Sequence, residues 1–173
     1  MIIRETEAGD IAAITAIYAH HVLHGTGTFE EDPPSEAEIT ARIAKVQGGG
    51  AAWLTALADD GSIAGYGYYA PLRERSAYRF TVEDSIYIRD DVRGQGVGKA
   101  LVAALIEHAE ARGRRQMVAV IGDSENTSSI GLHLSLGFRQ VGVQKSVGIK
   151  FGRWLDVVLM QRALGPGDRT PPS

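Results

Sequence analysis

The stretch Arg93-Gly-Gln-Gly-Val-Gly-Lys99, here called the glycine loop, separates two segments of different periodicity. The residues before it, Asp84 to Arg89, alternate as in a strand, and apolar residues recur at helical spacing from Val97 to Ala109. Alternate glycines let the backbone pass close to a ligand, and the unpaired N–H groups of a first helical turn attract anions. This strand–loop–helix unit therefore predicts a binding site for a phosphate or pyrophosphate.

Two common nucleotide motifs with similar glycines are not matched. A P-loop would need glycine where Arg93 stands and Ser or Thr where Ala100 stands. A dinucleotide fingerprint needs Gly-x-Gly-x-x-Gly after the first strand of a βαβ unit, whereas the glycines here follow Gly-x-Gly-x-Gly in mid-chain. With Arg93, Gly96 and Gly98 at its fixed positions, the loop instead resembles the pyrophosphate loop of the GCN5-related N-acetyltransferases (GNAT). A loop that only turns the chain is the alternative.

Length and composition predict one ordinary globular domain. The 173 residues include 18 Lys and Arg against 21 Asp and Glu, so the net charge of −3 gives no reason to expect nucleic acid or an anionic membrane as partner. We expect the domain over 1–164 and a flexible tail over 165–173, where three prolines occur. No spanning apolar run or signal-peptide pattern is present, which favours a cytoplasmic location.

Cysteine is absent, and this excludes disulfides, thiolate metal sites and an acyl-cysteine intermediate. A histidine metal site was the other possibility, because His20 and His24 are four residues apart on a predicted helix. No glutamate lies between them and no third ligand is evident, so we expect no metal.

Strand and helix patterns alternate along the chain and predict a mixed α/β sheet. Helices are expected after Asp10 and Ser35 as N-caps, after the glycine loop, and over 128–136. Strands are expected at 2–4, 53–58, 63–69, 78–88, 117–121, 140–145 and 154–162. The resemblance implies the GNAT fold (α/β, or α+β in some schemes), whose mixed, mostly antiparallel central sheet is flanked by helices.

Five segments in order resemble a narrower group, the phosphinothricin and methionine sulfoximine acetyltransferases. They are Thr26–Glu30, Thr81–Ile88, Val118–Gly122, Leu132–Phe138 and Lys150–Asp156, the last containing Trp154. The resemblance implies acetyl-CoA as co-substrate and, as acceptor, the α-amine of an analogue such as phosphinothricin, methionine sulfoximine or the sulfone. It also implies direct attack in a ternary complex and a homodimer.

An amino acid's α-ammonium must lose a proton before it attacks, and a nearby carboxylate can accept that proton. The group's base corresponds to Glu83, although a plain surface carboxylate is the alternative reading. In a regular strand Glu83 shares a face with Ser85 and Tyr87, and Asp84 faces the other way.

The resemblance assigns further residues. The backbone of Ile86, Tyr87 and Ile88 is expected to bond pantetheine amides and the thioester oxygen. His133 is expected to protonate the departing thiolate, with a packed helix histidine as the alternative. Cofactor binding is expected from Arg93, Gly94, Gln95, Gly96, Val97, Gly98, Lys99, Asn126 and Ser135, and substrate binding from Phe29, Arg73, Glu74, Arg75, Glu83, Asp84 and Ser85.

Asn126 as a helix N-cap and the arginines as solvated loop residues are the simpler alternatives. Two rival functions fit the same residues: acetylation of a polyamine or a protein N-terminus, and a non-catalytic acetyl-CoA-binding module. Arg73 and Arg75 disfavour a polyamine, which would require an acidic pocket.

Overall fold

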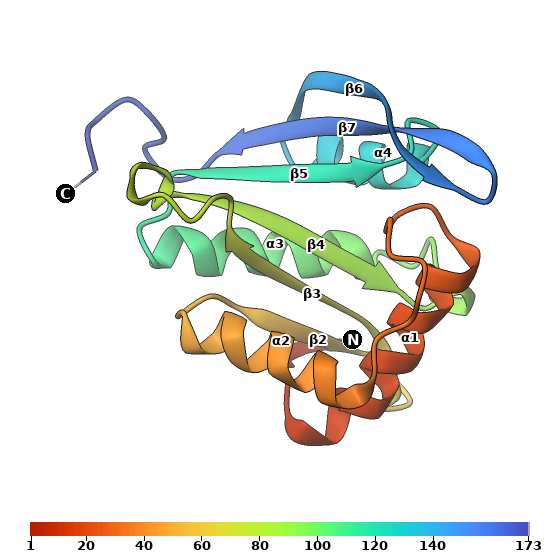
Figure 1. The fold of residues 1–173 in the computed structure, drawn as a ribbon. Coiled ribbons are helices and arrows are strands. Elements are labelled where there is room, and N and C mark those ends of the chain that lie inside the picture. The colour runs from red at the N-terminus through yellow and green to blue at the C-terminus, as the bar shows by residue number, and fades with distance from the viewer. Residues whose placement is uncertain (173) are drawn as a thin grey trace.

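The computed structural model describes residues 1–172 and contains one seven-stranded sheet in the order β1-β2-β3-β4-β5-β7-β6 (Figure 1). Neighbouring strands are antiparallel except β4 and β5, which are parallel. This confirms the predicted mixed, mostly antiparallel sheet. The strands are β1 (Ile2–Glu5), β2 (Trp53–Leu57), β3 (Ile63–Pro71), β4 (Thr81–Ile88), β5 (Gln116–Gly122), β6 (Arg139–Lys150) and β7 (Arg153–Ala163), and the helices are α1 (Ile11–His24), α2 (Glu36–Gly48), α3 (Val97–Ala111) and α4 (Thr127–Ser135).

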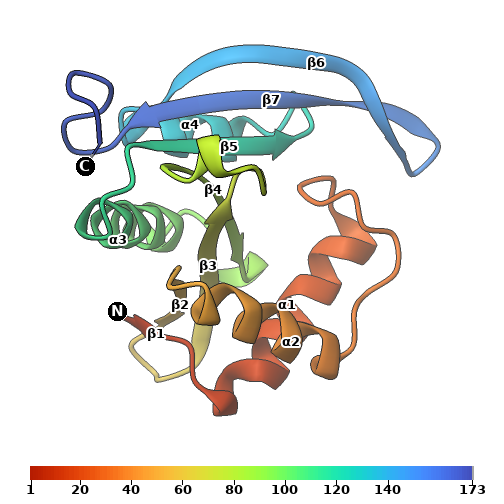
Figure 2. The same ribbon diagram turned by 60° about the vertical axis from the view of Figure 1, so that its left-hand side comes forward.

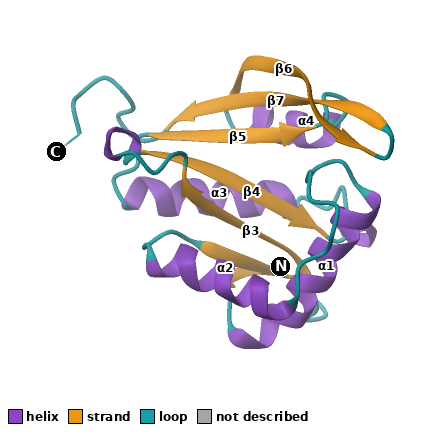
Figure 3. Ribbon diagram, in the orientation of Figure 1, coloured by secondary structure: helices purple, strands orange, loops and turns teal. Residues whose placement is uncertain are grey.

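Helices cover both faces of the sheet, as Figures 2 and 3 show. On one face, α1 and α2 bury residues such as Ile14 and Ile39 against Trp53 and Tyr66. On the other, α3 buries its apolar stripe, which includes Leu101, against β2, β3 and β4. These three strands therefore contribute alternate side chains to two separate cores.

The sheet divides between its two parallel strands. Residues Thr81 to Asp84 of β4 pair with Gln116 to Ala119 of β5, and no pairing continues beyond that point. Both strands run on, β4 to Ile88 and β5 to Gly122, and they diverge toward their carboxyl ends in Figure 1. The divergence leaves one edge of β4 without a neighbouring strand over its last four residues.

Two local expectations need correction. Asp10 precedes α1, but its carboxylate makes no capping bond to that helix; it accepts from Glu7 N–H at 2.9 Å and pairs with Arg4 at 2.7 Å. The fourth strand begins at Thr81 and not at Tyr78, because residues Ser76–Tyr78 form a 3₁₀ turn. The predicted N-cap Ser35 is confirmed, since its hydroxyl accepts from Glu38 N–H.

The segment after β7 is tied to the domain. Leu164 is fully buried, and Arg115 donates to the carbonyl oxygens of Gly167, at 2.9 Å, and Thr170, at 3.3 Å. The expected flexible tail over 165–173 is thus anchored over its first residues, and Ser173 lies outside the described residues. The division at 164 stays a prediction. Across residues 1–172 we find no helix with the length and apolar character to cross a membrane.

Candidate active site

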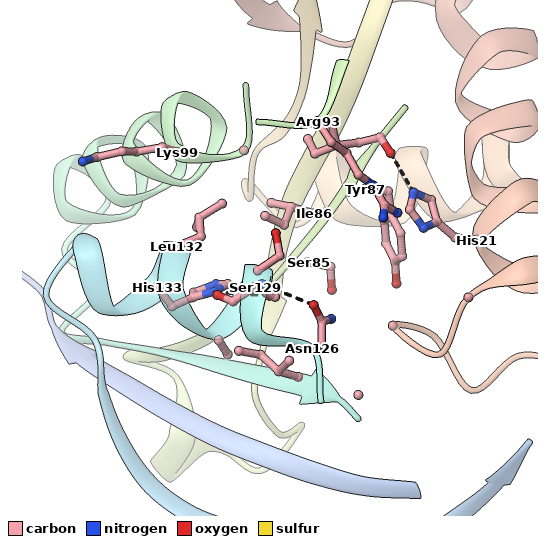
Figure 4. Close-up of a pocket in the computed structure, with 18 of the residues that line it drawn as sticks. His21, Ser85, Ile86, Tyr87, Arg93, Lys99, Asn126, Ser129, Leu132 and His133 are labelled. Carbon is pink, nitrogen blue, oxygen red and sulfur yellow. Dashed lines mark hydrogen bonds between the residues drawn. The ribbon is translucent and has the colours of Figure 1, made fainter. Parts of the chain in front are cut away.

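A cleft of about 570 Å³ opens where β4 and β5 diverge, within the range of small-molecule sites (Figure 4). Its walls come from β4, β5, the glycine loop, α4 and the segment after α1. The predicted site residues that line it are Asp84, Ser85, Ile86, Tyr87, Ile88, Arg93, Gly94, Gly96, Val97, Gly98, Lys99, Asn126, His133 and Ser135. Gln95, Glu83, Phe29, Arg73, Glu74 and Arg75 are not among its lining residues.

The glycine loop has the backbone that its sequence predicts. Gly94 and Gly96 have φ of +77° and +83°, values that favour glycine, and Gly96 is the N-cap of α3. The bond from Ala100 N–H to the Gly96 carbonyl begins the helix, so the N–H groups of residues 97–99 remain open toward the cleft. A Cβ on Gly98 would lie 2.6 Å from a Leu132 methyl carbon. The loop is therefore an anion cradle in which positive φ requires glycine at 94 and 96, and close packing against Leu132 requires it at 98.

Charged side chains beside the glycine loop already form ion pairs with one another. Arg93 lies beside it, but a guanidinium nitrogen contacts an Asp90 oxygen at 2.6 Å. On α1, His20 contacts the same carboxylate at 2.6 Å. Because Asp90 already pairs with Arg93, an incoming phosphate would compete with this carboxylate for the guanidinium.

Register decides which backbone groups of β4 face the cleft. The Thr81 carbonyl accepts a hydrogen bond from the β3 side, and the Arg89 N–H donates one to β3. Because bonding alternates along an antiparallel pair, residues 83, 85 and 87 also bond to β3, and Ile86 and Ile88 point toward β5. The expectation for Tyr87 is thus wrong: its backbone pairs with Tyr66, and only its side chain reaches the cleft.

His21, on α1, forms a hydrogen bond with one of these free backbone groups of β4. Its Nε2 lies 2.8 Å from the Ile88 carbonyl oxygen (Figure 4). Burial lowers the pKa of His21, more than the Ile88 carbonyl raises it, so the neutral ring donates from Nε2. The Ile86 N–H and carbonyl and the Ile88 N–H are left for a ligand.

Glu83 and Asp84 lie on opposite faces of β4, as strand alternation predicts. The half-buried Glu83 is on the α1/α2 face with Ser85 and Tyr87. Burial and the neighbouring Asp84 charge raise the pKa of Glu83, and the positive charge of Arg73 partly opposes them. Arg73 itself is exposed, as are Glu74 and Arg75, and the expected substrate contacts of these three residues stay predictions.

Asp84 and His133 form a buried pair on the other face. His133 Nε2 lies 3.0 Å from Asp84 Oδ2, and its Nδ1 lies 2.7 Å from the Ser129 carbonyl oxygen. Both ring nitrogens face acceptors, which requires a doubly protonated ring. Burial lowers the pKa of His133, but the Asp84 carboxylate and the Ser129 carbonyl outweigh it, and the net shift is upward.

This geometry corrects two expectations. His133 offers no free N–H to a departing thiolate, because both of its ring nitrogens are already bonded. Asp84 is buried beneath α4, away from the face on which Glu83 lies, so it does not share an acceptor site with that residue. Its Oδ1 has no hydrogen-bond partner among the described residues. The pair joins α4 to β4 at the wall of the cleft.

Asn126 has the simpler of the two roles that its sequence position allowed, and its contact with the cofactor stays a prediction. Its Oδ1 accepts from Ser129 N–H at 3.2 Å and so caps α4, as Figure 4 shows. Its amide nitrogen stays unused and lies at the cleft wall, close to Gly27. Ser135 donates to the Leu132 carbonyl at 2.7 Å.

The cleft also contains residues that sequence patterns did not identify. Gly25, Thr26 and Gly27 line it, although α1 ends just before them. Asp123 lines it with a φ of +73°, directly after the buried strand β5. The five-segment resemblance covered Thr26 without assigning it a contact, and a polar residue immediately after a buried strand was the available signal for Asp123.

The histidines of α1 do not form a metal site. The rings of His20 and His24 lie 4.8 Å apart, but His20 is bonded to Asp90. Within residues 1–172, no group of three or more His, Cys, Asp or Glu side chains could hold a metal ion.

A sheet split at one parallel pair, with a glycine-rich anion cradle beside the split, defines a class of acyl-group transferases. The acetyltransferase (GNAT) domain family matches residues 3–159. A phosphinothricin N-acetyltransferase of Alcaligenes faecalis is 55% identical over 98% of this chain and 86% of its own length. An L-methionine sulfoximine/L-methionine sulfone acetyltransferase of Pseudomonas aeruginosa is 42% identical over 98% of each chain.

Among solved structures, a GNAT phosphinothricin acetyltransferase from Sinorhizobium meliloti in complex with AcCoA superposes with a TM-score of 0.96. It is 47% identical, over 99% of this chain and 92% of that one. The chain therefore belongs to the GNAT family and is an N-acetyltransferase, which confirms the resemblance read from the glycine loop.

Proposed function

We propose that this enzyme transfers the acetyl group of acetyl-CoA to the α-amine of a small amino-acid analogue of the phosphinothricin or methionine sulfoximine type. The observation that carries the proposal is the split between β4 and β5, with the glycine loop at one end and Glu83 beside the other. The names of the relatives above support both substrates.

Acetyl-CoA fits the residues of the cleft. The N–H groups of residues 97–99 face the pyrophosphate position, and charge-assisted bonds of this kind contribute about 1.5–3 kcal/mol each. The free backbone groups of Ile86 and Ile88 suit the amides of the pantetheine arm, which would lie along β4 as a missing strand does. The unused amide of Asn126 can donate to the same arm.

The transfer step uses direct attack in a ternary complex. Glu83, directly or through a water, accepts a proton from the acceptor's α-ammonium. The freed lone pair attacks the thioester carbonyl carbon, the nitrogen loses its second proton, and the carbon–sulfur bond breaks. The departing CoA sulfur takes up one proton, so the products are the amide and the free thiol. A backbone N–H at Ile86 or Ile88 stabilises the oxyanion, a contribution of about 3–4 kcal/mol per donor in other enzymes.

The raised pKa of Glu83 suits a base that must accept a proton near neutral pH. The positive charge of Arg73 acts on Glu83, which supports an arrangement in which this guanidinium holds the acceptor's carboxylate while the amine faces Glu83. The positive charge of Arg73 disfavours a polyamine acceptor. The carboxylate of Glu83, at the position that corresponds to the group's base, disfavours a non-catalytic binding module.

A second copy of the chain is the proposed partner. The hairpin of β6 and β7 exposes a run of large apolar side chains, here called the hairpin patch: Val141, Val143, Val147, Ile149, Phe151 and Trp154. Trp154 is 65% exposed. Such exposure of a large apolar side chain is unusual on the surface of a monomer. We also propose a cytoplasmic location, where acetyl-CoA is consumed.

A thiol-release assay tests the activity. With acetyl-CoA held constant, phosphinothricin, methionine sulfoximine and methionine sulfone should release CoA thiol, and spermidine and an N-terminal peptide should not. Release with the peptide or spermidine alone would favour the rival acceptors. No release with any primary amine would contradict the enzymatic proposal.

A further inference from the structure

Lys150 is a buried lysine that the proposed reaction does not use. It ends β6, and the residue is only 3% exposed. Its Nζ donates to the carbonyl oxygens of Gly25, at 2.8 Å, and Thr28, at 2.9 Å. Burial lowers the pKa of this ammonium, more than Glu31 and Glu30 raise it. Burial of a charge costs free energy unless hydrogen bonds and pairing compensate, and here the two carbonyl oxygens supply the hydrogen bonds.

What Lys150 holds is the segment between α1 and α2, residues 25–30, here called the 25–30 loop. One further hydrogen bond attaches this loop to the residues at the end of β5. Thr26 Oγ1 donates to Asp123 Oδ2 at 2.8 Å, and Arg153 of β7 donates to the same oxygen at 2.7 Å. The β6–β7 hairpin thus contacts the loop directly through Lys150 and indirectly through Arg153 and Asp123.

Packing reinforces the attachment. The Phe29 ring lies against Gly148 so closely that a Cβ there would be 2.4 Å from the ring. Gly122, at the end of β5, is equally tight: its Cβ would lie 2.5 Å from the Thr26 carbonyl oxygen. Glycine at both positions allows the loop to sit directly on the strands. Phe29, expected to line the acceptor pocket, instead fastens the loop.

The loop forms a wall of the site on the side where Glu83 lies. Gly25, Thr26 and Gly27 line the cleft. Beyond them, Thr28 shares a hydrogen bond of 2.9 Å with Tyr18, whose ring meets that of Tyr87 edge-on at 4.8 Å. Because Tyr87 and Glu83 share a face of β4, these contacts connect the loop to the strand face that carries Glu83.

From these contacts we infer that Lys150 is a positioning residue: its ammonium fixes the 25–30 loop as the wall of the acceptor site. This inference rests on the proposed function for the meaning of that wall. Removing the ammonium would release the loop and weaken acceptor binding while leaving the pyrophosphate cradle intact. A purely stabilising role would lower stability without separating the two substrates.

The first experiment needs no turnover. We expect the amides of residues 25–30 to exchange with deuterium about tenfold faster in Lys150→Met, since a buried charge-assisted bond is lost. Lys145→Met is the matched control, because Lys145 lies on the same strand with a side chain that is 75% exposed. Unchanged exchange of the loop in Lys150→Met would overturn the inference, whatever the enzyme's substrates.

The second experiment reads the two substrates separately. The acceptor KM should rise about tenfold in Lys150→Met, and the Kd for acetyl-CoA, from calorimetry, should stay within about twofold. Lys150→Arg keeps charge and donors and should restore most of the acceptor KM. Equal weakening of both substrates, or an unchanged acceptor KM, would refute the positioning role.

If Lys150→Met does not fold, Gly148→Ala decides instead. The added Cβ displaces the Phe29 ring without touching the charge. It should raise the acceptor KM in the same direction, and Phe29→Leu in the same chain should relieve the clash and partly restore it. A folded Gly148→Ala variant with wild-type acceptor KM and loop exchange would refute the role.

Discussion

At the scale of residues, two adjacent carboxylates have separate tasks because a strand sends them to opposite faces. Glu83 faces α1 and α2, half-buried and with a raised pKa, where an amine can approach. Asp84 is buried against His133 beneath α4. The alternation was predictable from sequence. The partner of Asp84 was not, because His133 is 49 residues away and its packing depends on the fold.

Glu83→Gln should lower kcat at least a hundredfold while the Kd for acetyl-CoA stays unchanged, because general-base catalysis contributes about 10²–10⁴-fold. In the wild-type enzyme, kcat/KM should rise with pH through the raised pKa of Glu83, and that acid limb should vanish in the variant. Steady-state rates from pH 5 to 9 check both expectations. Turnover near the wild-type value would exclude Glu83 as the base.

The Asp84–His133 pair should make stability depend on pH in a definite direction. The folded-state pKa of His133 is raised, so its contribution is fully present below the unfolded value near 6.5. The contribution is lost as pH rises through the folded pKa.

Urea unfolding of the wild type and of the Asp84→Asn/His133→Gln double variant measures this dependence. The wild type should lose free energy of unfolding relative to the double variant as pH increases above 6.5. Parallel stability curves for the two proteins would show that the pair carries no charge.

At the scale of elements, the glycine loop and α3 are the part of the structure that sequence predicted best. Helical spacing and glycine chemistry are both local, and they locate the start of α3 at Val97. Strand β6 was predicted too short, because its pairing with β7 shifts between Gln144 and Gly148 and Ser146 takes a φ of +53°. Such an irregularity breaks the alternation on which strand prediction depends.

Gly96→Ala should weaken acetyl-CoA binding. Gly96 has a φ of +83°, where a Cβ costs roughly 1 kcal/mol, and relaxation of that strain would move the N–H groups of the cradle. Gly61 has the same φ of +83° in the β2–β3 turn, with no atom near its missing Cβ. Gly61→Ala is therefore a control, because it introduces the same backbone strain far from the cleft.

Both variants should lose similar stability in thermal unfolding, but only Gly96→Ala should raise the Kd for acetyl-CoA, by about tenfold if one charge-assisted bond is lost. Calorimetric titration measures it. Equal affinities in the two variants would mean that the cradle tolerates a shifted backbone.

At the scale of the whole molecule, the mixed sheet was predictable from sequence. The point at which β4 and β5 stop pairing was not. Sequence indicates which segments are strands, but the end of pairing at Asp84 and Ala119 results from the way two helical layers pack on opposite faces. The same limit applies to Lys150, whose carbonyl partners are more than a hundred residues earlier in the chain.

The hairpin patch should hold two copies together. Trp154→Glu places a charge in a desolvated interface, so sedimentation equilibrium should show the dimer of the wild type converted largely to monomer. Ile2→Glu is the control, since Ile2 is also exposed, at 63%, but lies on β1, at the opposite edge of the sheet from β6. A monomeric wild type, or dissociation by both variants, would contradict the proposed interface.

The early end of pairing between β4 and β5 has a thermodynamic consequence. An acetyl donor that hydrogen-bonds along the open edge of β4 takes the place of a neighbouring strand. Binding of the acetyl donor and folding of the chain are therefore thermodynamically linked. At a concentration one hundred times its Kd, such a ligand adds about 2.7 kcal/mol to the free energy of unfolding. Resistance of the chain to heat and to proteases should therefore follow the supply of acetyl donor, and enzyme in a donor-starved cell should be degraded sooner.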